Sequence, residues 1–204
     1  MSIAMQETIA QPEAGFAPGV YRLSVAQYFE MADKGILTTD DRVELIEGVL
    51  VAKMTKYPPH VLGTLLVFQE LSRILPAGWH ARQEAPVLTQ SSVPEPDCAI
   101  IRGGARDYRD HHPSLEDVAL VVEVADSSLN FDRKSKAKVY AKAAIPTYWI
   151  ANLVDHVIEV FSDPTGPPES PQYRATQIFT IDEVIPVVLD GHEIARIAVR
   201  DLLP

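Results

Sequence analysis

Two acidic residues occupy strand-like positions where a carboxylate is costly. Glu123 lies inside the almost wholly apolar run VALVVEV (118–124), and Asp97 stands between PEP and the apolar CAII. A buried carboxylate needs a cationic partner or a metal ion. If the two strands are neighbours, both carboxylates can converge on Mg²⁺ or Mn²⁺, and such an ion activates water for phosphodiester chemistry. The alternative is a structural ion pair or a hydrogen-bonded strand end.

The segment after Glu123 offers four lysines, and helical geometry selects one of them. A helix turns by about 100° per residue, which puts Lys136 on the same stripe as Val139. The other three lie on the opposite side and are expected to form a solvated face: Lys134, Lys138 and Lys142. Lys136 is therefore expected to point toward the sheet, where an ammonium group can stabilise a developing negative charge. A snorkelling side chain, or an exposed pair with Asp132, is the alternative.

Local patterns predict the elements that would position these residues. Ser24 can cap a helix whose apolar residues recur at helical spacing, and Gly35 stands just past its end. Residues 42–54 alternate apolar and polar side chains on both sides of Gly48, which indicates two strands joined by a tight turn. Glu44 would lie on the first of these strands.

Further along the chain, hydrophobic periodicity predicts two helices and a series of short strands. An amphipathic helix is expected over 60–75, and a second helix over 132–144, where Pro146 ends it. The apolar stripe of the first helix would be formed by Val61, Leu65, Phe68, Leu71 and Leu75. Strands are expected at 79–82, 85–88, 97–101, 118–124, 147–152, 157–161, 173–179, 185–188 and 194–198.

Composition limits the class of protein. The 204 residues fit one domain, for which we expect a flexible arm at 1–18 and a single domain at 19–204 with a β-rich extension from about 156. The single cysteine excludes an intramolecular disulfide, and no segment is apolar enough to span a bilayer, so we expect a cytoplasmic protein without membrane contact. The net charge of −10 means that any contact with DNA must come from a local basic patch.

Six short motifs follow one another between about residues 24 and 161. They are VELIEG (43–48), PPH (58–60), PEPD (94–97), LVVEV (120–124), FDRKSKAKVYAKAAIP (131–146) and YWI (148–150). In order and spacing they resemble the Uma-two group of restriction endonucleases, a branch of the PD-(D/E)XK nuclease superfamily. The resemblance implies an α/β fold, a mixed sheet flanked by helices with a restriction-endonuclease-like core, and Asp97 and Glu123 as metal ligands.

The same resemblance adds candidate residues. Glu44 matches the glutamate of an early motif and would be a third acid near the metal, with a surface charge at the strand edge as the alternative. The superfamily's lysine usually stands two residues after the second acid, where this chain has an alanine. In this family the lysine is moved to the following helix, which fits Lys136. His60 and Gln83 match positions that are often polar and near the site, although a histidine that opens a helix is more often a cap or a surface group.

Two functions are compatible with these observations. The first is a Mg²⁺-dependent or Mn²⁺-dependent DNA endonuclease, expected to act as a homodimer because many nucleases cut two strands with two copies. The second is a catalytically weak binding or regulatory module with a nuclease fold, linked to defence or mobile elements. The acidic composition favours the second, and the joint presence of Glu44, Asp97, Glu123 and Lys136 favours the first.

Overall fold

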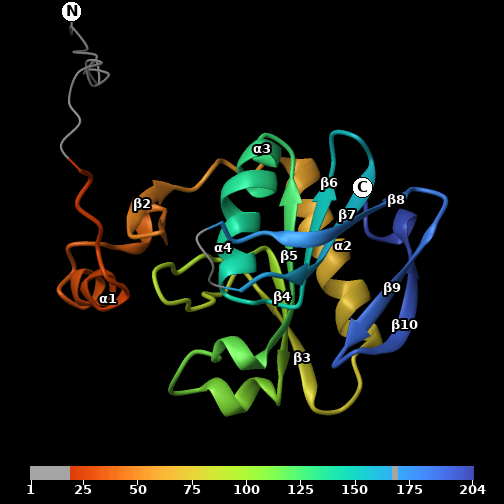
Figure 1. Ribbon diagram of the computed structural model, residues 1–204, viewed down its shortest axis with the longest axis horizontal. Coiled ribbons are helices and arrows are strands. Elements are labelled where there is room, and N and C mark those ends of the chain that lie inside the picture. The colour runs from red at the N-terminus through yellow and green to blue at the C-terminus, as the bar shows by residue number, and fades with distance from the viewer. Residues whose placement is uncertain (1–18, 167–169) are drawn as a thin grey trace, which may run out of the picture.

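A six-stranded mixed sheet forms the centre of the molecule in the computed structural model, which describes residues 19–166 and 170–204 (Figure 1). The predicted arm at 1–18 lies outside the described residues. The strand order is β3-β4-β5-β6-β7-β8, and only β5 and β6 pair in parallel among these neighbours. The strands are β3 (Trp79–Gln83), β4 (Cys98–Arg102), β5 (Val118–Ala125), β6 (Thr147–Asn152), β7 (Val157–Pro164) and β8 (Tyr173–Thr180). The predicted mixed sheet flanked by helices is confirmed.

Strand β5 is the most deeply buried element of the sheet. Every residue of its sequence VALVVEVA is buried, because helices cover both faces. A continuous apolar run of this kind is typical of a strand enclosed on both sides. Glu123 is the single charged residue in the strand, so its environment has to compensate for its charge.

Helix α2 (Pro58–Ile74) covers one face of the sheet, and its buried side is rotated from the predicted stripe but overlaps it. Leu71 is buried and Phe68 and Leu75 pack against the core as predicted. Val61 and Leu65 of the predicted stripe are 54% and 42% exposed, whereas Thr64 and Val67 are buried. The physical reason is Gly63: a Cβ atom at this position would lie 3.1 Å from Cγ1 of Val124. A glycine permits this close approach between helix and strand, and the approach fixes the rotation of the helix.

The opposite face is covered by a helical segment that contains a π-helical turn. It consists of α3 (Leu129–Phe131), the π-helical turn Asp132–Lys136 and α4 (Ala137–Lys142). The helix predicted over 132–144 is therefore present but starts earlier and is not uniform. As predicted, Lys136 is buried while Lys134 and Lys138 are exposed. Lys142, expected on the same solvated face, is instead partly buried and pairs with Glu47 at 2.8 Å. Such turns are frequently found at functional sites.

The N-terminal part of the described chain forms a helix and a hairpin on one side of the sheet (Figure 1). Ser24 caps α1 (Val25–Asp33) through a capping box with Gln27, and β1 (Val43–Ile46) pairs with β2 (Val49–Ala52) as predicted. The hairpin turn has positive φ at both central residues, 49° at Glu47 and 77° at Gly48, which is the geometry that favours glycine in tight hairpins.

The strand predicted at 85–88 is wrong, because this segment folds back on itself as a loop. The backbone nitrogen of Val87 donates to the carbonyl oxygen of Pro94 at 2.9 Å, and that of Thr89 donates to Ser92 at 2.9 Å. Pro86 has no N–H group to give to a sheet. The end of this loop is tied to the β1–β2 hairpin by a β-bridge between Leu45 and Val93 and by further hydrogen bonds, among them one of 2.8 Å from the backbone nitrogen of Gly48 to the carbonyl oxygen of Ser91.

The C-terminal strands complete the layer that contains α2. β7 and β8 belong to the central sheet, while β9 (Val184–Leu189) and β10 (His192–Ala198) form a separate hairpin whose buried residues share a core with α2. Short 3-10 helices lie at Thr39–Asp41, Ala105–Tyr108, Leu115–Asp117 and Val199–Asp201. In the described part of the chain, no helix has the length and apolar character that a bilayer crossing requires.

Candidate functional site

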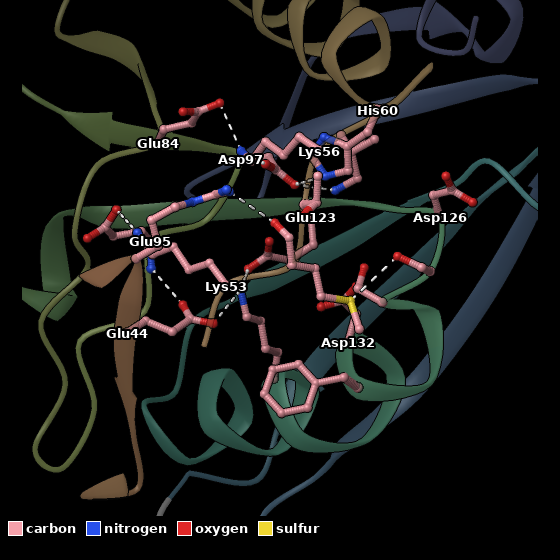
Figure 2. Close-up of a pocket in the computed structure, with 18 of the residues that line it drawn as sticks. Glu44, Lys53, Lys56, His60, Glu84, Glu95, Asp97, Glu123, Asp126 and Asp132 are labelled. Carbon is pink, nitrogen blue, oxygen red and sulfur yellow. Dashed lines mark hydrogen bonds and ion pairs between the residues drawn. The ribbon is translucent and has the colours of Figure 1, made fainter. Parts of the chain in front are cut away.

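A pocket of about 450 Å³ lies at the carboxyl end of β5, and its wall carries many charged side chains (Figure 2). The acidic residues that line it are Glu44, Glu84, Glu95, Asp97, Glu123, Asp126 and Asp132, and the basic ones are Arg42, Lys53, Lys56, His60 and Lys136. Five of the six residues selected from the sequence are therefore brought together. Gln83 is the exception, since it is exposed at the end of β3 and does not line the pocket.

The pairing of β4 with β5 brings Asp97 next to Glu123. The strands are antiparallel with Cys98 opposite Val122, so the next residues outward, Asp97 and Glu123, point to the same face of the sheet. The backbone nitrogen of Val124 donates a hydrogen bond of 2.8 Å to Oδ2 of Asp97. Both carboxylates are buried. The expectation that the two acidic strands are neighbours is confirmed.

Lys136 lies between the carboxylates of two different strands. Its Nζ donates to Oε1 of Glu123 at 2.9 Å and lies 3.3 Å from Oε1 of Glu44, which β1 contributes. The hydroxyl of Tyr140, one helical turn further on, donates to the same oxygen of Glu123 at 2.6 Å. Glu44 is buried, and its Oε2 accepts a hydrogen bond of 3.2 Å from the backbone nitrogen of Glu95. Neither Glu44 nor Lys136 is a surface charge.

Asp97 has two further partners from the segment that leads into α2. Nζ of Lys56 donates to Oδ1 of Asp97 at 2.8 Å and to Glu84 at 2.9 Å, and Nε2 of His60 lies 3.4 Å from Oδ2 of Asp97. Figure 2 shows Lys56 and His60 approaching Asp97 from the same side. The sequence prediction did not include Lys56, which lies before the helix, since α2 begins at Pro58 with Tyr57 as its N-cap. No local pattern identifies it, because its partners Asp97 and Glu84 are far away in the sequence.

Asp132 is a fourth buried carboxylate in this pocket. Helical spacing puts it on the same stripe as Lys136, with an exposed pair of the two residues as the alternative, but the sequence did not select it as a site residue. Its side chain is 2% exposed, and its Oδ2 is buried without a hydrogen-bond partner. Figure 2 shows it beside the pocket-lining side chains of the helical segment.

Burial and crowding of like charges change the acidity of these groups. Burial, together with the neighbouring carboxylates, raises the pKa of Glu123 to about 8 despite the charge of Lys136. Burial also raises the pKa of Asp132 to about 6. Burial acts in the same direction on Asp97, but His60 and Lys56 outweigh it and lower the pKa of Asp97 to about 2. The pKa of Lys136 is raised because Glu123 and Glu44 outweigh its burial.

The donor set fits a hard divalent cation. Four buried carboxylates line one pocket, and Mg²⁺ and Mn²⁺ prefer oxygen ligands of this kind; the four are Glu44, Asp97, Glu123 and Asp132. Across residues 19–166 and 170–204, however, no three His, Cys, Asp or Glu side chains already stand as metal ligands around one point. Lys136 forms ion pairs with Glu44 and Glu123, and Lys56 forms one with Asp97. A metal ion would therefore have to compete with these two lysines for the carboxylates.

A family model and a solved structure are similar to this chain. The model of the Uma2 family, described as "Putative restriction endonuclease", matches residues 25–198. A crystal structure from Anabaena variabilis, described as that of "a putative nuclease belonging to DUF820", is similar with a TM-score of 0.64 and 14% sequence identity, and the match covers 88% of this chain and 97% of that one. At this identity the likeness shows the fold alone. No curated protein sequence matches the chain.

Proposed function

Because this chain belongs to the Uma2 family, we propose that it is a metal-dependent DNA endonuclease whose active site is the pocket at the end of β5. The observation that carries the proposal is the convergence of Glu44, Asp97 and Glu123 with Lys136 in one buried cluster. Buried charges of both signs are expensive to assemble, so a cluster of this size at a pocket wall favours a chemical role over a structural one.

Glu44, Asp97 and Glu123 would hold a Mg²⁺ or Mn²⁺ ion. When bound, the ion would polarise the scissile phosphate and acidify the attacking water. The protein already orients the ligands: the backbone of Val124 holds Asp97, and the hydroxyl of Tyr140 holds Glu123. Such supporting hydrogen bonds tune metal affinity and fix the direction of the ligand oxygens.

Lys136 would act on the phosphate itself. Its ammonium group is shared between Glu44 and Glu123, so charge that a cation supplies to these carboxylates would free Lys136 to contact a phosphate oxygen. A positioned cation stabilises the negative charge that develops there in the transition state. Lys136 would therefore pair with Glu44 and Glu123 in the metal-free protein and contact the phosphate during hydrolysis.

A local group of cations at the pocket would offset the acidic net charge of the chain. Arg42 lines the pocket from just before β1, and Lys53 and Lys56 line it from the segment between β2 and α2. Phosphate backbones are bound mainly through such charges, with a strong dependence on salt concentration. Lys53 and Lys56 are paired with carboxylates of the same pocket, so a bound metal ion would have to neutralise part of this negative charge before these cations could contact DNA.

The test is cleavage of supercoiled and linear DNA by the purified protein with Mg²⁺, with Mn²⁺ and with EDTA. Glu123→Gln removes a proposed ligand with little change in shape, and Glu116→Gln, an exposed residue just before the same strand, is the matched control. We expect metal-dependent cleavage that Glu123→Gln lowers at least about 100-fold and Glu116→Gln leaves unchanged. Binding of DNA without cleavage under every metal would contradict the proposal and favour the binding module.

A further inference from the structure

Asp132 has a buried carboxylate oxygen without a hydrogen-bond partner, which is rare in a protein interior. Its carboxylate is 2% exposed and lines the pocket, and Oδ2 makes no hydrogen bond. Buried polar side chains nearly always have a partner, since water is no longer available to them. The unpaired Oδ2 therefore costs stability, a cost that Lys136 and the Ser128 hydroxyl offset only in part.

The nearest cation is already engaged elsewhere. Asp132 and Lys136 stand at the two ends of the π-helical turn, but the ion pairs of Lys136 are with Glu44 and Glu123. Arg133, the next residue along, turns away from the pocket and forms ion pairs with Glu159 and Asp155. Among the residues that the structure describes, no ion pair involves Asp132, although two cations are its neighbours in the helix.

The surroundings of Asp132 hold more negative than positive charge. Burial is the main reason that the pKa of Asp132 is raised; Asp97 and Glu44 raise it further, while Lys136 and the Ser128 hydroxyl act against them. A structural carboxylate would be placed beside a donor, as Asp97 is beside the backbone of Val124. A carboxylate that binds a metal ion would instead have an oxygen without a protein partner on the wall of a charged pocket.

We propose that Asp132 is a further carboxylate ligand, not included in the set selected from the sequence, for a hard divalent cation bound at this pocket. The inference rests on the proposed function, because it assumes that Asp97 and Glu123 bind such an ion. The free Oδ2 is the donor atom, and the π-helical turn is what presents it to the pocket together with Lys136.

The test is calorimetric binding of Mn²⁺ to the full chain. Asp132→Asn keeps the shape of the side chain and removes its charge, and Asp126→Asn alters a second pocket-lining carboxylate that is only partly buried. We expect Asp132→Asn to weaken binding by about tenfold or more and Asp126→Asn by about twofold or less. Equal affinities for wild type and Asp132→Asn would overturn the inference.

A second measurement separates a ligand from a structural residue. In EDTA, Asp132→Asn is expected to unfold at the same temperature as the wild type or a higher one, because the substitution removes an unpaired buried charge. A lower unfolding temperature together with unchanged Mn²⁺ affinity would make Asp132 structural. Anomalous scattering from Mn²⁺ soaked into wild-type crystals gives a result without any variant: the ion must lie in contact with an oxygen of Asp132.

Failure of the inference and failure of the proposed function give different results. If Asp97→Asn abolishes Mn²⁺ binding and Asp132→Asn does not weaken it, the metal site stands and only the role of Asp132 is refuted. If the wild type binds no Mn²⁺, both the metal-dependent function and the role of Asp132 are refuted.

Discussion

Nζ of Lys136 lies 2.9 Å from Oε1 of Glu123. The helical segment after β5 therefore places a buried ammonium group against a carboxylate of that strand. The contact spans only 13 residues of sequence. It nevertheless requires the sheet, because β1 supplies Glu44 on the other side of the same ammonium group at 3.3 Å. The stability of the fold and the proposed chemistry therefore both depend on Lys136, Glu123 and Glu44. Experiments can separate the two effects.

Lys136→Met is expected to affect both properties. Cleavage should fall by about 10²–10³-fold, the range seen when one group that stabilises transition-state charge is removed. The metal-free protein should also lose about 3–5 kcal/mol, because two buried carboxylates lose their common partner. Lys138→Met, on the exposed side of α4, should change neither. Urea unfolding in EDTA and DNA cleavage with Mn²⁺ measure the two effects, and a destabilised variant that cleaves at the wild-type rate would make Lys136 purely structural.

Lys56→Met should strengthen the binding of divalent metal. Lys56 contacts Oδ1 of Asp97 at 2.8 Å, so a metal ion has to displace it or share the carboxylate with it. Loss of one competing cation from a partly exposed ion pair should raise Mn²⁺ affinity by roughly three- to tenfold. Lys53→Met is the matched control, since Lys53 lines the same pocket but pairs with Glu95. Calorimetry decides: equal gains in both variants would show a general charge effect and no specific competition at Asp97.

The stability of the metal-free protein should depend on pH with a defined sign. The pKa of Asp132 is raised from 3.8 to about 6 and that of Glu123 from 4.5 to about 8. The folded state therefore binds these protons more tightly than the unfolded chain does. Their contribution is complete below about pH 4 and is lost as the pH rises through 6 and 8.

Urea unfolding in EDTA between pH 4.5 and 8.5 tests this sign, over a window chosen to span those two raised pKa values. Asp132→Asn should remove the part of the decline that lies below about pH 6, which amounts to about 3 kcal/mol at most. Asp97 acts in the opposite direction, since its pKa of about 2 makes its contribution disappear only as the pH falls below 3.8. A wild type and an Asp132→Asn variant with parallel pH profiles would refute the raised pKa of Asp132.

The rotation of α2 can be tested with two leucines of the predicted stripe. Leu71 is fully buried, whereas Leu65 is 42% exposed. Leu71→Ala should cost about 2–5 kcal/mol, the usual range for a buried leucine, and Leu65→Ala less than about 1 kcal/mol. Denaturant midpoints of the two variants give the comparison. Similar losses would mean that the predicted stripe faces the core after all.

Much of the fold could be predicted because it depends on neighbouring residues. The apolar run around Glu123 indicates a covered strand whatever lies on its faces, and Gly48 supplies the positive φ that a tight turn needs. Ser24 offers its hydroxyl to the first turn of α1. Lys136 was selected by helical spacing alone, and the π-helical turn did not change the side on which it lies.

The tertiary structure decided what depends on residues far apart in the chain. Both sides of α2 carry apolar residues, and only the approach of Gly63 to Val124 determines which side is buried. The sequence determined by itself that Glu123 is a buried acid in need of a cation. Only the folded chain decided that Lys136 and Lys56 serve the acids of this pocket and that Asp132 keeps a free oxygen, because burial and pairing are properties of the assembled neighbours and not of a local pattern.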